Sequence, residues 1–192
     1  ILPFFPKKIR TVFFLSIFIC ILTVFLMGVV QDLNFFIFIR FVHGVFSAFV
    51  LILGTSIILP HIQELGKIHL STAHFSGVGL GMVFSSIVVS LFGYYGYQWN
   101  DLWIAIGILS VLLSLQIIFY TPYEIELSNK NPINQQPSRF GFTLISISYC
   151  LYGFGYVAFG TFISTMARTT PNIQSTEPYV WLTVGLFGIP SV

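Results

Sequence analysis

The sequence predicts an all-α, polytopic membrane protein, and three observations support that prediction. Of its 192 residues, 56% are hydrophobic and only 7% are charged. Soluble domains carry about a quarter charged residues, so this chain is too poor in charge to cover a water-facing surface. It also contains five apolar runs that are each long enough to cross a bilayer core of about 30 Å as a helix. These runs do not alternate between polar and apolar residues as the strands of an outer-membrane barrel do.

The predicted spans follow one another with short polar connections between most of them. Five are full length, at 11–30, 35–59, 71–97, 101–121 and 140–167, and an incomplete sixth covers 179–192. We expect Pro60 and Pro122 to end the second and fourth helices, because proline does not continue a helix. Asp101 is a candidate N-cap of the fourth. The sixth run is too short to cross the bilayer and the chain starts without Met, so we expect both ends to be truncations.

The stretch 123–139 is the only long polar segment of the chain. It is rich in Asn, Ser, Gln and Pro, a composition typical of loops. We interpret it as the boundary between two helical bundles, one at 1–122 and one that begins at 140.

Basic residues gather in alternate connections, which predicts the orientation of the chain. Segments 1–10, 60–70 and 122–139 contain Lys7, Lys8, Arg10, Lys67, Lys130 and Arg139, whereas the opposite connections contain only Arg168. Cytoplasmic loops carry the excess of Lys and Arg, so these three segments are predicted to be cytoplasmic. We expect a multi-pass protein of the bacterial inner membrane. The aromatic residues Trp99 and Trp103 then belong to a belt at the outer interface.

One face of the second span is polar, and polar residues at membrane depth point to function because they are costly there. At roughly 100° per residue, this face collects Arg40, His43, Gly44, Ser47, Gly54 and Thr55. Arg40 has two interpretations. It either reaches the outer interface or caps a nearby loop, with Asp32 as a candidate partner, or it faces a cavity and holds an anion or modulates a protonatable group.

His43 lies one turn deeper on the same face. Histidine changes charge more readily near physiological pH than any other unperturbed side chain, and a neighbouring arginine favours its neutral form. The residue is therefore either a hydrogen-bonding strut between helices or a proton-coupling group.

The fifth span carries a second polar face, with Ser146, Tyr149, Tyr152, Gly153, Tyr156, Gly160 and Ser164. The tyrosines offer hydroxyl groups and aromatic faces to an amphipathic or aromatic solute. The other interpretation is helix packing, with tyrosines hydrogen-bonded to neighbouring helices.

Small residues in the third span predict close helix packing. Gly77 and Gly81 lie on one side and Gly79 lies nearly opposite, so two neighbours can approach. We assign Gly44, Gly153 and Gly160 the same role. A dinucleotide-binding fingerprint is excluded, because these glycines do not follow a strand.

The remaining function classes lack their motifs. No zinc-protease HExxH and no Gly-x-Ser-x-Gly occurs, and no span carries two carboxylates, so we predict that the protein is not an enzyme and has no metal or cofactor. A net charge of +2 is too small for nucleic-acid binding.

Several of these motifs resemble the major facilitator superfamily. Arg-Phe-Val-His-Gly at 40–44 resembles its fourth-helix Arg-x-x-x-Gly signature, and the basic end of segment 1–10 resembles the end of its loop between helices two and three. Ser-Gly-Val-Gly-Leu-Gly at 76–81, Trp99 with Trp103, and Tyr-Gly-Phe-Gly-Tyr at 152–156 are similar to the YbfB/YjiJ-like branch.

The resemblance implies a partial major facilitator fold that covers about helices three to eight. Residues 1–122 would be helices three to six of the N-terminal lobe, 123–139 the linker between lobes, and 140–192 the start of the C-terminal lobe. Helices four and seven usually line the central cavity, and they would be the helices with the two polar faces. The chain departs from the pattern in having no Pro after Gly81, so the antiporter form of that motif is not met.

We therefore expect a secondary active transporter that moves a small organic solute across the membrane by alternating access, coupled to protons. Arg40, His43 and Ser47 are predicted to serve charge and coupling, and Tyr149, Tyr152 and Tyr156 to contact the solute. The expected partners are the lipid bilayer, the solute and protons. The alternative is a non-transporting membrane scaffold or sensor, or a degenerate remnant of a transporter.

Overall fold

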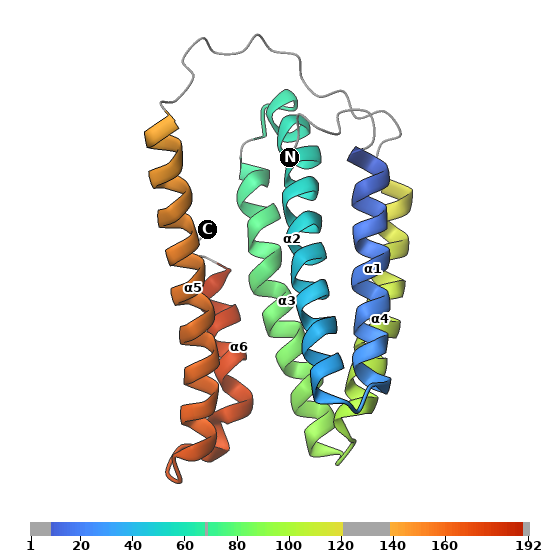
Figure 1. Cartoon of the computed structure of the whole chain (residues 1–192), viewed down its shortest axis with the longest axis vertical. Helices are drawn as coiled ribbons and strands as arrows, with labels where there is room; N and C mark the ends of the chain where they lie inside the picture. Colours follow the sequence, from blue (N-terminus) through green and yellow to red (C-terminus); the bar gives the residue numbers. More distant parts are fainter. Residues whose placement is uncertain (1–8, 68, 121–138, 190–192) are drawn as a thin grey trace. The chain divides into compact units, whose positions relative to one another are not determined.

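The computed structural model describes residues 9–67, 69–120 and 139–189, and all secondary structure in these ranges is helical (Figure 1). The helices are α1 (Ile9–Val29), α2 (Leu33–Glu64), α3 (His69–Tyr94), α4 (Trp99–Tyr120), α5 (Arg139–Thr169), the short 3₁₀ helix η2 (Gln174–Thr176) and α6 (Glu177–Gly188). Helices α1 to α5 are long and apolar enough to cross a membrane. The predicted all-α polytopic fold is therefore confirmed.

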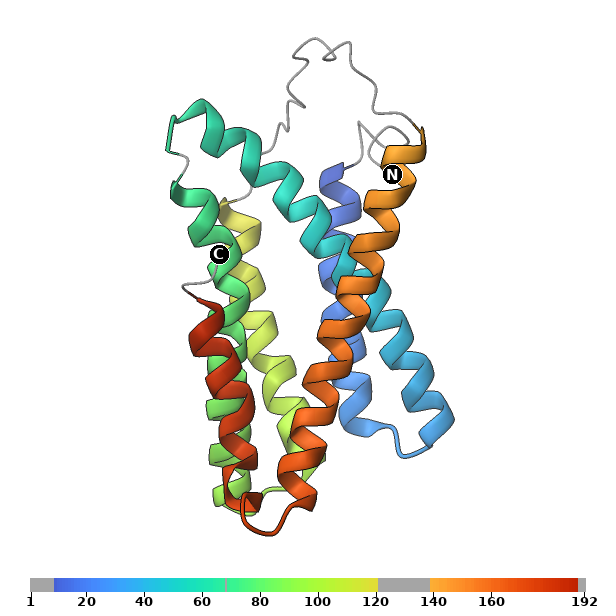
Figure 2. The same cartoon turned by 90° about the vertical axis from the view of Figure 1, so that its left-hand side faces the viewer.

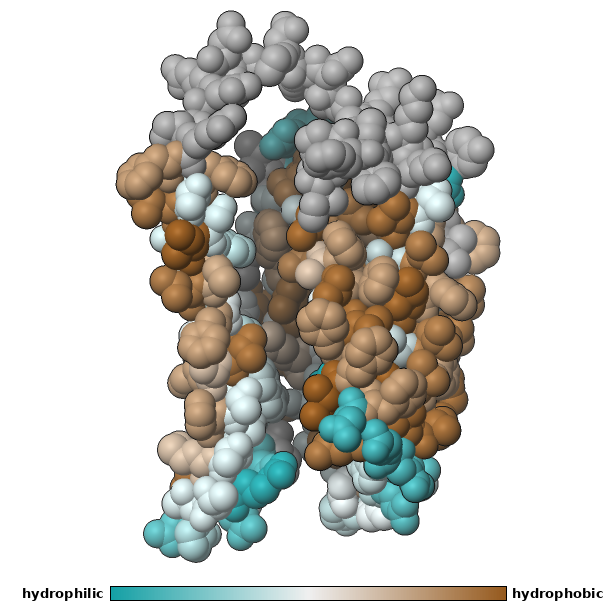
Figure 3. Space-filling model, viewed as in Figure 1, coloured by the Kyte–Doolittle hydropathy of each residue, from teal (hydrophilic) through white to brown (hydrophobic). Residues whose placement is uncertain are grey.

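Large apolar side chains stay exposed along the helices instead of forming one buried core. Phe41 is 68% exposed, and Phe154 is 74% exposed. Apolar residues cover the middle of the helices in Figure 3, and hydrophilic residues gather near their ends. Such a surface suits contact with the hydrocarbon of a bilayer.

The chain divides into two compact units. Unit 1 contains α1, α2, α4 and the two ends of α3, and unit 2 contains residues 72–91 of α3 with α5 and α6. Residues 123–138 of the predicted linker lie outside the described ranges, as does Pro122, and residue 139 already begins α5.

In unit 1, α1 runs antiparallel to α2 and α4 and packs against both (Figures 1 and 2). The contact with α2 is a small apolar cluster of Ile9, Phe13, Leu53 and Ile57. In the contact with α4, a Cβ added to Gly107 would lie 2.8 Å from the Phe25 ring. Because glycine has no side chain at this position, the two helices can approach each other closely.

In unit 2, glycines lie at the contacts of α6 with α3 and with α5. A Cβ added to Gly79 of α3 would lie 2.9 Å from the carbonyl oxygen of Gly185 of α6. A Cβ on Gly160 of α5 would lie 2.5 Å from the Trp181 ring of α6. Helix α6 is thus held on two sides by contacts that leave no room for a methyl group.

The prediction that Pro60 ends the second helix was wrong, because α2 continues through it to Glu64. Proline removes one backbone hydrogen bond and bends a helix, but the next turn can still form. The last part of α2 indeed turns away from the axis of the rest (Figure 2). The helix stops where Gly66 adopts φ of 64° and Lys67 N–H bonds to the Ile62 carbonyl, a Schellman motif.

Asp101 was also wrongly predicted as an N-cap. Helix α4 begins two positions earlier, at Trp99, so Asp101 lies in the first turn. Its carboxylate accepts a hydrogen bond from the Gln98 backbone N–H at 3.1 Å, which is the reciprocal half of a capping box. The acidic residue still stabilises the start of the helix, from inside it.

Candidate functional site

Helices α1, α2 and α4 of unit 1 line an open cavity of about 330 Å³, which we call the polar groove. Most of its lining is apolar, and its polar members are Cys20 from α1, His43 and Ser47 from α2, and Ser110 and Ser114 from α4. Two predicted site residues, His43 and Ser47, therefore share one cavity. A larger cavity of about 750 Å³ between α1 and α4 is almost wholly apolar, with Arg10 at one end, and is a weaker candidate for solute binding.

His43 is half-buried and is bonded to the neighbouring helix. Its Nδ1 lies 2.8 Å from the hydroxyl oxygen of Thr23 on α1, and Thr23 is itself buried. The same hydroxyl oxygen lies 2.9 Å from the Ile19 carbonyl and 2.8 Å from the Cys20 carbonyl. This contact joins α1 and α2 at membrane depth, where a polar side chain without a partner is costly.

The serines of the polar groove use their hydroxyl protons within their own helices. Ser47 donates to the Gly44 carbonyl at 3.0 Å, Ser110 to the Ile106 carbonyl and Ser114 to the Val111 carbonyl, both at 2.8 Å. With the protons so placed, the serine oxygens have only lone pairs left to offer a ligand.

Arg40 is exposed and lies against Trp103 at the start of α4 and Phe36 of its own helix. Its guanidinium carbon is 4.9 Å from the centre of the Trp103 ring and 5.5 Å from that of Phe36. The Phe36 ring also meets Trp99 and Trp103 edge-on. A cation over aromatic faces is stabilised by about 0.5 to 2 kcal/mol. Within the described ranges no carboxylate lies within ion-pair distance of Arg40.

The candidate partner of Arg40, Asp32, has a different role. It is the N-cap of α2, and its side chain accepts a hydrogen bond from the Phe35 backbone N–H at 2.8 Å. Such a cap satisfies one of the free N–H groups at a helix start.

The three predicted tyrosines lie in unit 2, on α5. Tyr149 and Tyr152 are 78% and 71% exposed, and their ring centres are 6.5 Å apart. Tyr156 is less exposed, and its hydroxyl donates to the Met82 sulfur of α3 at 3.5 Å. The first two therefore offer free aromatic faces, while the third also takes part in helix packing.

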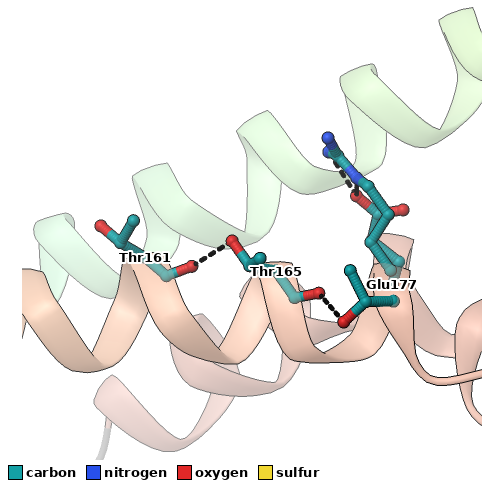
Figure 4. A network of polar contacts seen from close by, with 5 residues as sticks. Thr161, Thr165 and Glu177 are labelled. Carbon is teal, nitrogen blue, oxygen red and sulfur yellow. Dashed lines mark hydrogen bonds and ion pairs between the residues drawn. The ribbon is translucent and has the colours of Figure 1, made fainter.

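The C-terminal end of α5 carries a separate polar network (Figure 4). Thr165 donates to the Thr161 carbonyl at 3.0 Å, and Thr169 donates to the Thr165 carbonyl at 2.9 Å. Beside them Arg168 forms an ion pair with Glu177 at 2.6 Å, which connects α5 to the start of α6. Arg168 is 71% exposed, so this pair contributes little to stability.

The predicted packing glycines fall into two groups. Gly79 and Gly160 lie at the close contacts of unit 2 described above. A Cβ added at Gly44, Gly77, Gly81 or Gly153 would meet no atom within 4 Å.

The sequence did not connect four residues of this region with His43 and Arg40: Thr23, Ser110, Ser114 and Trp103. Thr23 lies in an uncharged run and Trp103 in a predicted interfacial belt, so neither stood out as a site residue. Hydroxyl residues at similar depth on neighbouring spans are the signal that points to Thr23, Ser110 and Ser114. Among the described residues no group of three His, Cys, Asp or Glu side chains is placed to hold a metal ion.

A comparison with protein families shows what the chain is similar to. The family model described as uncharacterised MFS-type transporter YbfB matches residues 4–192. No curated protein and no solved structure matches the chain. The match spans both units, including the polar groove and the tyrosines of α5.

Proposed function

Because the chain belongs to this family of MFS-type transporters, we propose that it moves a small organic solute by alternating access, with proton coupling. The family and the five apolar helices make it a multi-pass membrane protein and a transporter. The solute, the coupling ion and the mechanism are our proposal.

The observation that carries the proposal is the unpaired charge of Arg40. In the described part of the chain its only partners are aromatic rings, which leave the N–H donors of the guanidinium available. A planar guanidinium suits bidentate binding of a carboxylate. We infer that the solute carries an anionic group that Arg40 binds, with His43 and Ser47 one and two turns deeper on the same helix face.

The aromatic faces of Tyr149 and Tyr152 support a second contact with the apolar part of the solute. The proposal places α2 and α5 as cavity-lining helices four and seven, residues 1–122 in one lobe, and 140–192 in the other. It also places the protein in a bacterial inner membrane, with segments 1–10, 60–70 and 122–139 in the cytoplasm.

Uptake into proteoliposomes that contain the full-length protein tests the proposal. The probes are radiolabelled small carboxylic acids, each paired with its neutral amide, with and without an imposed proton gradient. We expect uptake of at least one carboxylate, faster with the gradient. Arg40→Gln should lower its initial rate by about tenfold or more, which corresponds to about 1.4 kcal/mol of binding free energy, and Arg40→Lys by less.

Arg168→Gln is the matched control, because Arg168 pairs with a carboxylate at a helix end. It should leave the rate near that of the wild type. An equal loss in both variants would show that the effect on transport is not specific to Arg40.

The alternative is a non-transporting scaffold or sensor. One observation favours it: both His43 and Arg40 contact neighbours within their own unit, as purely structural residues would. Absence of gradient-dependent uptake for every probe, in a folded protein, would support this alternative.

A further inference from the structure

The hydrogen bonds around Thr23 bear on which nitrogen of His43 carries the proton. The Thr23 oxygen lies 2.8 to 2.9 Å from three atoms: the carbonyl oxygens of Ile19 and Cys20 and Nδ1 of His43. A hydroxyl group has a single proton to donate, and a carbonyl oxygen can only accept.

If the Thr23 proton pointed at Nδ1, its oxygen would face two carbonyl oxygens at hydrogen-bond distance with no proton between them. That arrangement is repulsive. If the proton points at a carbonyl, the Thr23 oxygen must accept from His43, and Nδ1 must carry a hydrogen. The second arrangement satisfies the His43 contact and one carbonyl, or both carbonyls where the proton is shared between them, whereas the first satisfies the His43 contact alone.

We propose that Thr23 is a positioning residue that holds the His43 ring with its proton on Nδ1, so that Nε2 is the bare nitrogen available to a ligand in the polar groove. In a neutral imidazole one nitrogen donates and the other accepts. The partner of Nδ1 therefore decides what Nε2 can bind.

The chemistry of the polar groove agrees with this role for Nε2. Ser47, Ser110 and Ser114 direct their protons to carbonyls of their own helices. With Nε2 bare, the polar groups that α2 and α4 contribute to the polar groove are all acceptors. The polar groove is thus matched to a hydrogen-bond donor: an N–H or O–H group of a solute, or a water molecule that delivers a proton. This use of the groove depends on the proposed transport function, whereas the tautomer of His43 does not.

Solid-state ¹⁵N NMR of the full-length protein in lipid bilayers, with ¹⁵N-labelled histidine, tests the tautomer. The signals of His43 are identified by their loss in His43→Gln. We expect a protonated Nδ1 and a bare Nε2 in the wild type and in Thr23→Ser, which keeps the hydroxyl. In Thr23→Val, which has nearly the same shape without a hydroxyl, the Nε2–H tautomer should appear.

A wild-type His43 with its proton on Nε2, or with both nitrogens protonated, would overturn the proposal. So would an unchanged tautomer in Thr23→Val, because another group would then be holding the ring. The uptake assay separates the two proposals. A protein without transport but with the Nδ1–H tautomer contradicts only the proposed function, and an active transporter with the Nε2–H tautomer contradicts only this inference.

Discussion

At the scale of single residues, the polar groups of α2 are stabilised by neighbours in their own unit. His43 is bonded to Thr23, and Arg40 lies over Trp103. Both contacts stabilise a polar side chain at membrane depth, where the loss of water is costly. Neither contact uses an opposite charge, so each residue keeps chemical capacity for a ligand: N–H donors on Arg40 and one ring nitrogen on His43.

Asp32 provides a test that separates a helix cap from a charge partner. Replacement by alanine removes the bond to the Phe35 N–H and should destabilise the protein by about 1 kcal/mol. Replacement by asparagine keeps the cap without the charge and should cost much less. Thermal unfolding of the full-length protein in detergent measures both. Equal losses in the two variants would mean that the charge of Asp32, and not its cap, supports the structure.

The sequence predicted which residues share the polar face of α2, because the helical period alone determines that face. It did not predict their partners. Thr23 and Trp103 lie about 20 and 60 positions away, and which helix meets that face depends on tertiary packing. The helix ends show the same limit. Pro60 is a strong stop signal locally, yet Gly66 and the bonds of its Schellman motif set the actual end of α2.

At the scale of helices, the close approach of two helices depends on which glycine faces the neighbour and not on how many glycines a helix contains. Gly77, Gly79 and Gly81 occur in a run of six residues, but among them only Gly79 meets another helix within 4 Å. The other two face open space, because positions two residues apart lie on different faces of a helix.

Alanine substitutions in this run should therefore have opposite effects. Gly79→Ala places a methyl group 2.9 Å from the Gly185 carbonyl and 3.0 Å from the Ile189 nitrogen, both of them backbone atoms that cannot rotate away. We expect a loss of about 1 to 3 kcal/mol and a lower unfolding temperature. Gly81→Ala should be neutral, or stabilising by up to about 1 kcal/mol, because alanine favours the helix. Equal destabilisation by both variants would contradict this packing of α3 on α6.

At the scale of the whole molecule, a chain of apolar membrane helices has an orientation in the bilayer as well as a fold. Within unit 1, α1 runs antiparallel to α2 and α4 (Figure 1), so the connections of that unit alternate between its two ends. The distribution of Lys and Arg predicts which end is cytoplasmic. That prediction can be measured directly.

Cysteine accessibility provides that measurement. In a cysteine-free background, which replaces Cys20 and Cys150, a single cysteine is placed at Gln63, near the end of α2, or at Gln98, before α4; both positions are exposed. In intact bacterial cells, a membrane-impermeant thiol reagent should label Gln98→Cys and leave Gln63→Cys unlabelled until the membrane is opened. The opposite pattern would reverse the orientation. Labelling of both positions in intact cells would mean that the end of α2 and the turn between α3 and α4 do not lie on opposite sides of the membrane.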